Sequence, residues 1–225
     1  MSEKHAIYKQ LKDTLQKPGC PICHIGEAAG RKYLDILLFE SVNDPGIRRQ
    51  LESSLGFCYY HSRELLTFPG KRLGAGIIEQ HMLKVALRQI QKSSAPPRRS
   101  LFSKRDENQK VKKTPCPACE QAEAAESRAA KDMLQHFVDD LDQPIAEAGG
   151  LCLNHVQLAV SVCKDKETHA ALIRLHEPLW QEEIALLDEF IRKHDHRFRH
   201  EGITQTEGNA LARSIDIITG ERPTS

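Results

Sequence analysis

The sequence predicts an all-α protein made of two tandem, structurally similar helical halves, each closed by one metal site. Aromatic residues make up only 5% of the 225 residues, while Leu, Ala, Glu, Lys and Arg are abundant, which favours helices over sheets. Apolar residues recur at helical spacing along most of the chain. A CPxC motif followed by GxCxxH occurs twice, from Cys20 to His61 and from Cys116 to His155. This repetition predicts two related metal sites.

The composition limits the cellular compartment and the class of partner that we expect. The formal net charge is +1, so an interaction with nucleic acid would have to rest on a local basic patch. No run reaches the roughly 18 apolar residues that a membrane span needs. Residues 1–10 lack the apolar core of a signal peptide, so we expect a cytoplasmic protein with no membrane contact. In that compartment the 7 cysteines favour metal or redox chemistry over disulfides.

In the first half, helix boundaries follow from capping residues. Asp44 can accept hydrogen bonds from first-turn amides, and Pro45 suits the first helical position. Gly56 suits the left-handed residue that closes a helix, and the chain reversal there puts Cys58 and His61 at the start of the next one. We expect helices over 4–16, 24–43, 45–55, 58–66 and 71–92, the last with two apolar rows (Ile78, Met82, Val85 and Leu83, Leu87, Ile90) that pack the half together.

We predict four regions: a first metal-binding half over 1–92, a basic flexible linker over 93–113, a second metal-binding half over 114–200 and a tail over 201–225. Counted from Lys92, the linker carries 8 Lys or Arg and 2 Asp or Glu, with few apolar residues. In the second half and tail we expect helices over 119–141, 166–193 and 210–218, with a break at Gln143-Pro144 and a short helix after it. Trp180, Ile184, Leu187 and Ile191 share one face of the long helix.

The cysteines and histidines match structural zinc sites. A Cys-x-x-Cys turn can direct two thiolates at one ion, and a Cys and a His three residues apart share a helix face, which completes a closed Cys3His set. The interval before the closing pair is 34 residues in the first copy and 32 in the second. We therefore expect two Zn²⁺ per chain, although a [4Fe–4S] cluster would suit similar ligands. The predicted sets are Cys20, Cys23, Cys58 and His61, and Cys116, Cys119, Cys152 and His155.

Two other interpretations of the CxxC motifs are weaker, and the seventh cysteine stands apart from them. The string from Cys20 to His24 matches c-type haem attachment, but an export signal is missing and Glu120 replaces the histidine in the second copy. No strand–helix–strand pattern surrounds the CxxC pairs, which argues against a thioredoxin-like role. Cys163 is unpaired and is expected in the core.

Two further groups have a functional and a plain interpretation. Glu27 and Glu123, equivalent in the two copies, could orient a metal ligand or could be exposed helix residues. The His194–His200 segment could bind a metal or phosphate, or could be a solvated cap at the end of a helix.

The chain also resembles a family of bacterial proteins with a duplicated CPxC…GxCxxH plan and no assigned activity. The matching stretches are Tyr33-Leu34-Asp35, Glu40-Ser41-Val42-Asn43-Asp44-Pro45, Gly56-Phe57-Cys58, and Glu189-Phe190-Ile191-Arg192-Lys193-His194-Asp195 leading into Arg197-Phe198-Arg199. The resemblance implies a shared fold and metal plan and no mechanism. No Tyr-Leu-Asp follows Cys119, so the second half departs from the first.

These observations favour a zinc-binding interaction or regulatory module that is not an enzyme, with another protein as its partner. A thiol-based redox or metal sensor is the alternative, and an iron–sulfur protein in electron transfer is a third. Nucleic-acid binding through the basic linker is the weaker alternative for the partner, because Phe102 is the only aromatic residue available there for base stacking.

Overall fold

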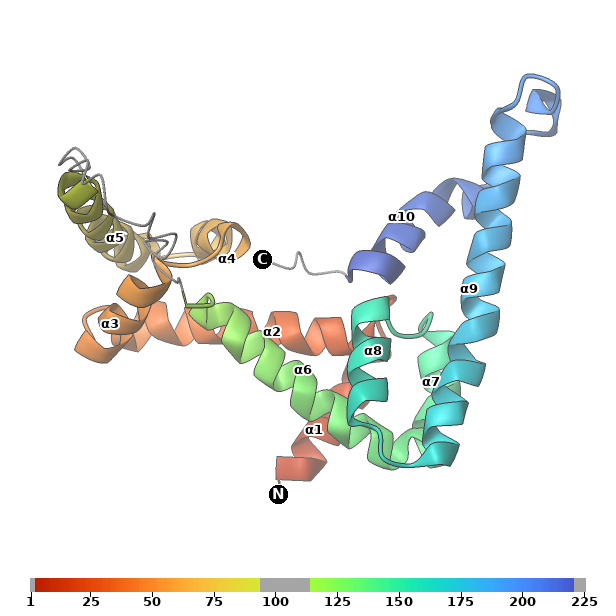
Figure 1. The fold of residues 1–225 in the computed structure, drawn as a ribbon, viewed down its shortest axis with the longest axis horizontal. Helices are drawn as coiled ribbons and strands as arrows, with labels where there is room; N and C mark the ends of the chain where they lie inside the picture. The colour runs from red at the N-terminus through yellow and green to blue at the C-terminus, as the bar shows by residue number, and fades with distance from the viewer. Residues whose placement is uncertain (1–2, 94–113, 221–225) are drawn as a thin grey trace, which may run out of the picture. The chain divides into compact units, whose positions relative to one another are not determined.

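The computed structural model describes residues 3–93 and 114–220, and every element in these ranges is a helix (Figure 1). The predicted all-α class is confirmed. None of the described helices is long and apolar enough to span a bilayer. Apart from Ser93, the predicted linker over 93–113 lies outside the described residues.

The chain forms two compact units, and each takes segments from both sequence halves. Unit 1 contains residues 1–28 and 123–224, and unit 2 contains residues 29–122. The chain passes from unit 1 to unit 2 within helix α2 (Pro21–Ile36) and returns within helix α6 (Pro117–His136).

Unit 2 is built on the second part of α2 and the first turns of α6. Between them the chain forms the π-helical turn η1 (Leu37–Ser41), α3 (Pro45–Ser54), α4 (Tyr59–Glu64), the 3-10 turn η2 (Leu65–Thr67) and α5 (Arg72–Ser93). Asp44 caps α3 by accepting a hydrogen bond from the Ile47 amide at 2.8 Å. Leu55 and Gly56 close α3 with φ values of 57° and 86°, so the predicted capping residues are confirmed.

The core of unit 2 gathers one apolar row from α5 and the inner faces of its other helices. Ile78, Met82 and Val85 are buried there, whereas Leu83, Leu87 and Ile90 are exposed. Of the two apolar rows of α5, only the first is therefore buried in the core of unit 2. The buried cluster also contains Leu34, Leu37, Leu38, Leu51, Leu65, Phe68, Ala75, Cys116, Ala118 and Cys119.

Unit 1 contains α1 (Glu3–Thr14), the start of α2, the remainder of α6, the π-helical turn η3 (Phe137–Leu141), α7 (Asp142–Glu147), α8 (Leu153–Val162), α9 (Lys166–His194), the 3-10 turn η4 (Arg199–Glu201) and α10 (Gln205–Thr219). Its largest fully buried side chains include Met133, Phe137, Leu141, Leu151 and Leu172. The predicted break at Gln143-Pro144 is wrong. Pro144 lies in the first turn of α7, where an amide has no partner within the helix, so proline is tolerated.

The last two long helices differ in detail from the prediction. In α9 the buried residues are Thr168, Leu172 and His176, whereas Ile184 and Ile191 of the predicted apolar face are exposed. Helix α10 begins at Gln205, five residues earlier than predicted, because Thr204 and Glu207 form a capping box. Figure 1 shows α10 leading back from the end of α9 toward α8.

Candidate metal centres

Each opening cysteine pair lies at the start of a long helix. Cys20 immediately precedes α2 and Cys116 immediately precedes α6, and in each case proline takes the first helical position. The backbone carbonyls of Cys20 and Cys116 accept hydrogen bonds from the amides of His24 and Glu120, as the carbonyls of N-cap residues do. The positive end of each helix dipole therefore lies at an opening cysteine pair, where it offsets part of the cost of burying a thiolate.

Each closing pair lies at the start of a shorter helix. Cys58 caps α4 and Cys152 caps α8, with nearly the same extended backbone, φ −65° and −69°. Gly56 and Gly150 precede them with φ values of 86° and 85°, a conformation that L residues rarely adopt. The histidine three residues after each cysteine, His61 or His155, then points the same way as the sulfur atom.

The structure brings all eight predicted ligands into two groups of four, but the predicted pairing is wrong. Site 1 lies in unit 1 and combines the first opening pair with the second closing pair: Cys20, Cys23, Cys152 and His155. Site 2 lies in unit 2 and combines the second opening pair with the first closing pair: Cys58, His61, Cys116 and Cys119.

The length of the helices explains the exchange. Helix α2 has 16 residues and is about 24 Å long, at about 1.5 Å per residue. The chain that leaves its far end therefore starts well away from Cys20 and Cys23, and it folds into unit 2 together with the opening pair of α6. A backbone bond from the Thr114 amide to the Ser53 carbonyl, 3.2 Å, holds the approach to Cys116 against the end of α3.

In site 1 the donor atoms surround one point. The Nδ1 atom of His155 lies 3.4 Å from the Cys20 sulfur, 3.3 Å from that of Cys23 and 3.2 Å from that of Cys152. The Cys23 and Cys152 sulfur atoms are 3.7 Å apart.

Site 2 repeats these distances. The Nδ1 atom of His61 lies 3.2 Å from the Cys58 sulfur, 3.6 Å from that of Cys116 and 3.4 Å from that of Cys119. The Cys58 and Cys119 sulfur atoms are 3.7 Å apart.

These distances fit a single tetrahedral ion. With Zn–S near ~2.3 Å and Zn–N near ~2.0 Å, a regular tetrahedron has sulfur–sulfur edges of about 3.8 Å and sulfur–nitrogen edges of about 3.5 Å. In both groups these sulfur–nitrogen and sulfur–sulfur distances lie between 3.2 and 3.7 Å. The donor sets and their spacing therefore suit one metal ion per site.

Site 1 has a carboxylate behind its histidine. The Glu126 side chain is buried, and its Oε2 lies 3.6 Å from Nε2 of His155, the ring nitrogen that faces away from the sulfur atoms. A carboxylate in this place fixes the ring orientation and increases the basicity of the ligating nitrogen. Gly26 makes room for it, because a Cβ atom there would lie 2.0 Å from the Glu126 carboxylate.

Glu126 is not among the residues expected from the sequence, although the pattern around it contains a signal. Glu126 stands in a buried helical row with Ala122, Ala129 and Met133, so a carboxylate interrupts an otherwise apolar stripe. Glu27 and Glu123, the carboxylates considered from the sequence, are both exposed.

The pKa values of the thiols differ in direction. Burial raises the pKa of Cys20 well above its ordinary value and raises that of Cys119 to about 12, with the neighbouring thiols adding to both shifts. Hydrogen bonds from Cys20 and Cys23 lower the pKa of Cys152. Since metal ions bind thiolates, an ion entering either site must displace protons, and metal affinity should rise with pH.

The remaining candidates lie outside both groups. His24 bonds the Pro18 carbonyl at 2.9 Å, and the Cys163 thiol is only partly buried, because α8 ends at Val162 and the extended backbone carries Cys163 off the helix face. In the segment 194–200, His194 bonds the Phe190 carbonyl and Arg197 pairs with Asp195. Among the described residues, neither of the two four-residue groups includes a histidine of this segment.

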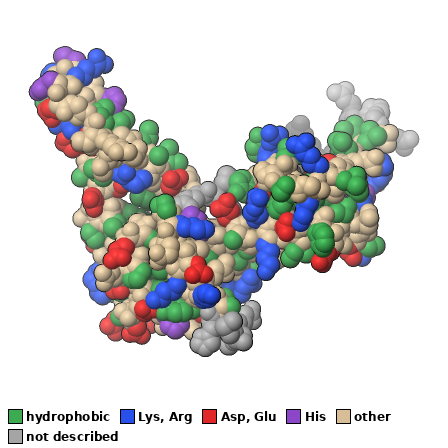
Figure 2. Space-filling model, turned by 180° about the vertical axis from the view of Figure 1, so that it is seen from behind, with side chains coloured by type: hydrophobic (Ala, Val, Ile, Leu, Met, Phe, Trp, Pro, Cys, Tyr) green, Lys and Arg blue, Asp and Glu red, His purple; other side chains and the backbone are tan. Residues whose placement is uncertain are grey.

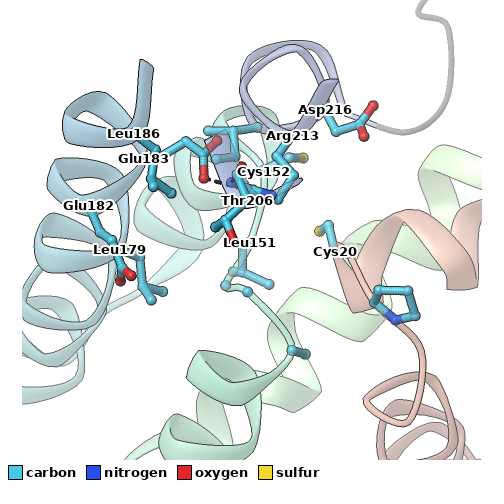
Figure 3. A pocket seen from close by; sticks show the side chains of 16 residues that line it. Cys20, Leu151, Cys152, Leu179, Glu182, Glu183, Leu186, Thr206, Arg213 and Asp216 are labelled. Carbon is cyan, nitrogen blue, oxygen red and sulfur yellow. Dashed lines mark hydrogen bonds and ion pairs between the residues drawn. The ribbon is translucent and has the colours of Figure 1, made fainter. Parts of the chain in front are cut away.

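A cavity of about 480 Å³ adjoins site 1 within unit 1 (Figure 3). Cys20 and Cys152 form part of its wall, which also contains an ion pair between Arg213 of α10 and Glu183 of α9, Nε to Oε2 3.0 Å. The two cysteine side chains nevertheless expose only 5% and 3% of their surface.

Comparison with known proteins assigns the chain to a family. The profile of the family of unknown function DUF6062 matches residues 4–225. The chain belongs to the DUF6062 family. Among curated proteins, this DUF6062 member is similar to the "Uncharacterized 23.9 kDa protein in xynA 3'region" of Caldicellulosiruptor sp. (strain Rt8B.4), at 23% identity over 210 residues, which covers 92% of this chain and 98% of the relative. No solved structure matches this chain. The membership fits the predicted resemblance to a family without an assigned activity.

Proposed function

We propose that this DUF6062 member is a zinc protein whose two ions cross-link its helices, and that it acts as an interaction or regulatory module and not as an enzyme. The observation that carries the proposal is the pair of Cys3His groups, whose donor distances match the edges of a tetrahedron around one ion.

The donor spacing favours zinc over an iron–sulfur cluster. A [4Fe–4S] cluster binds each ligand to a different iron atom, so its ligands must spread around a cage larger than one ion. Here all four donor atoms of each group lie within 4.8 Å of one another. Four thiolate and imidazole donors at this spacing suit a single zinc ion.

The ligand count supports a structural role. Catalytic zinc sites have three protein ligands and keep one position for water or substrate, whereas structural sites take four. Both groups supply four donors, and seven of the eight side chains are buried. The ions would then stabilise units in which the opening and closing pairs are far apart in sequence, so metal binding contributes directly to folding.

The proposed partner is a protein, and unit 1 offers a surface for it. A groove between α9 and α10 is lined by Trp180, Ile184, Leu187, Ile215 and Ile218. From 175 to 191, α9 carries five acidic residues and neither Lys nor Arg. Glu183 and Glu189 pair with Arg213 and Arg192, and the other three are Glu177, Glu182 and Asp188. An apolar groove beside acidic side chains suits an amphipathic helix with a basic flank.

The chain itself carries such a helix, so we take a second copy as the occupant. The exposed row of α5, Leu83, Leu87 and Ile90, has Lys84 and Arg88 beside it. Elsewhere the charge is mixed: on the face drawn in Figure 2, Lys or Arg and Asp or Glu side chains of the described residues are interspersed. This pattern supports a protein partner over nucleic acid.

Two measurements test the proposal. Elemental analysis of protein purified without oxygen should give two zinc ions per chain in a colourless sample, and a brown sample containing iron and sulfide would refute zinc. Sedimentation velocity at rising concentration should show self-association that Leu87→Glu weakens at least about tenfold, an expected cost of about 1.4 kcal/mol. The matched control is Leu66→Glu, an exposed leucine outside α5. A monomer at all concentrations would refute the second copy as occupant.

A further inference from the structure

We infer that the two sites differ in reactivity: site 2 is the redox-sensitive centre that releases its ion, with Cys58 as the thiolate that reacts first, and site 1 is the stable one. The inference rests on the proposed binding of one metal ion to each site. It concerns which of the two sites responds to an oxidant of the hydroperoxide class.

Access separates the two sites. All four ligands of site 1 are buried, whereas site 2 has one partly exposed ligand, Cys58. The next residue, Tyr59, exposes 84% of its surface, so the chain around Cys58 faces solvent. The equivalent cysteine of site 1, Cys152, exposes 3%. Oxidation of a thiolate requires that the oxidant reach the sulfur atom, so exposure selects Cys58.

Site 1 has a cover formed by the end of α10. A Cβ atom built on Gly220 would lie 3.4 Å from the Cys23 sulfur and 3.5 Å from the Cys152 sulfur, so this backbone already packs against both. The Asn154 side-chain amide donates to the Thr219 carbonyl at 3.0 Å and holds the end of α10 on the start of α8. The cavity of Figure 3 reaches the wall formed by Cys20 and Cys152 without exposing them, and Glu126 further fixes His155.

Site 2 also contains the partner thiol that a two-electron oxidation needs. The Cys58 sulfur attacks one oxygen of the hydroperoxide: a sulfur–oxygen bond forms, the oxygen–oxygen bond breaks, and the leaving oxygen takes a proton and departs as water or an alcohol. The Cys119 sulfur, 3.7 Å from that of Cys58, then attacks the sulfenic sulfur. A disulfide forms and the hydroxyl leaves as water with a second proton. Two thiolates are oxidised and the peroxide is reduced, so site 2 keeps only Cys116 and His61 as donors and loses its ion.

The single tryptophan of the chain makes the two sites distinguishable. Trp180 lies in unit 1, and its ring packs edge-on against His176 with centroids 5.9 Å apart. His176 accepts the Leu151 amide at 2.9 Å, next to the site 1 ligand Cys152. Loosening site 1 should therefore change Trp180 fluorescence, whereas loss of the ion from site 2 should leave it unchanged.

The test uses the full chain loaded with two zinc ions and treated with hydrogen peroxide beside a coloured zinc indicator. We expect one ion per chain to appear at least about tenfold faster than the second, with constant Trp180 fluorescence in the first phase. Mass spectrometry after alkylation should find the Cys58–Cys119 disulfide at that stage. The matched control is Cys163→Ser, which removes a partly buried thiol outside both groups and should leave both phases unchanged.

A second variant keeps the inference falsifiable without removing a ligand. Glu126→Gln should accelerate the second phase about 10- to 100-fold and leave the first unchanged, because Glu126 lies against the ring of the site 1 residue His155. Release of both ions in one phase, earlier oxidation of Cys20 or Cys152 through the cavity, or a fluorescence change in the first phase would overturn the inference. Protein that binds no metal when loaded would instead refute the proposed function.

Discussion

The exchanged pairing of the cysteine motifs makes a sharp prediction about double variants. Cys20 and Cys152 belong to one site, whereas Cys20 and Cys58 belong to different sites. Cys20→Ala with Cys152→Ala should therefore leave one tightly bound ion per chain, and Cys20→Ala with Cys58→Ala should leave none. Alanine is used because it offers no replacement donor.

If the ions are zinc, as proposed, the size of the effect follows from the energetics of structural zinc sites. Apparent binding free energies are about 10–16 kcal/mol at neutral pH, so one of four ligands contributes roughly 2.5–4 kcal/mol if they share equally. A single substitution should then weaken that site by about 10²- to 10³-fold, since each 1.4 kcal/mol is a factor of ten. The other site should keep its affinity.

The assay is metal content after equilibration with a chelator that buffers free zinc between the intact and weakened affinities. Chemical unfolding provides a second readout: the destabilisation caused by Cys20→Ala and Cys58→Ala should add within about 0.5 kcal/mol, whereas that of Cys20→Ala and Cys152→Ala should fall well short of the sum. One retained ion in the Cys20→Ala, Cys58→Ala variant would show that each half keeps its own site, and the exchanged pairing would be refuted.

Three further predictions concern substitutions of single residues. Burial lowers the pKa of His176 in the folded protein. As the pH falls, His176 is therefore protonated in the unfolded chain before it is protonated in the folded one. The contribution of neutral His176 to the unfolding free energy is complete above the ordinary pKa of about 6.5 and declines below it. The unfolding free energy of the wild type should thus drop more between pH 7 and pH 5 than that of His176→Gln, and parallel profiles would contradict this. Gly76→Ala should stabilise α5 by up to about 1 kcal/mol because its Cβ meets nothing within 4 Å, whereas Gly26→Ala should cost about 1–3 kcal/mol by displacing Glu126; calorimetry giving the same sign for both would contradict the packing. Thr204→Ala should destabilise α10 by about 1 kcal/mol and raise amide exchange there while exchange in α5 stays constant, and protection unchanged in α10 would contradict the capping box.

Sequence patterns predicted those features that depend on neighbouring residues. The caps at Asp44 and Gly56 and the placement of Cys58 at a helix start depend on a few adjacent residues, and all agree with the structure. The eight cysteine and histidine residues that form the two groups could be singled out because the motif repeats. The sequence also contains the signature of the α10 capping box, Thr204 followed three residues later by Glu207. The predicted helix nevertheless begins at 210, whereas α10 begins at Gln205.

The pairing of the motifs could not be predicted in the same way. Both pairings use the same residues and spacings, and the choice depends on where the ends of α2 and α6 lie in the folded chain. The same reason explains why the buried face of α5 could not be chosen from the sequence. Its two apolar rows look equivalent there, although only Ile78, Met82 and Val85 pack against other helices. Periodicity identifies a face and does not say whether another element covers it.

The exchanged pairing nests one cross-link inside the other. Site 1 joins Cys23 and Cys152 across a sequence separation of 129, and site 2 joins Cys58 and Cys119 across 61 residues within that loop. Closing site 2 first leaves only the two motif intervals of 34 and 32 residues free, about half the original loop. Because loop-closure entropy costs about 0.6 kcal/mol per doubling, site 2 would assist site 1 by only about threefold. Chain entropy would therefore couple the sites only weakly. The proposed order of ion loss then depends on the local contacts of each site, namely the end of α10 over site 1 and the exposure of Cys58 at site 2.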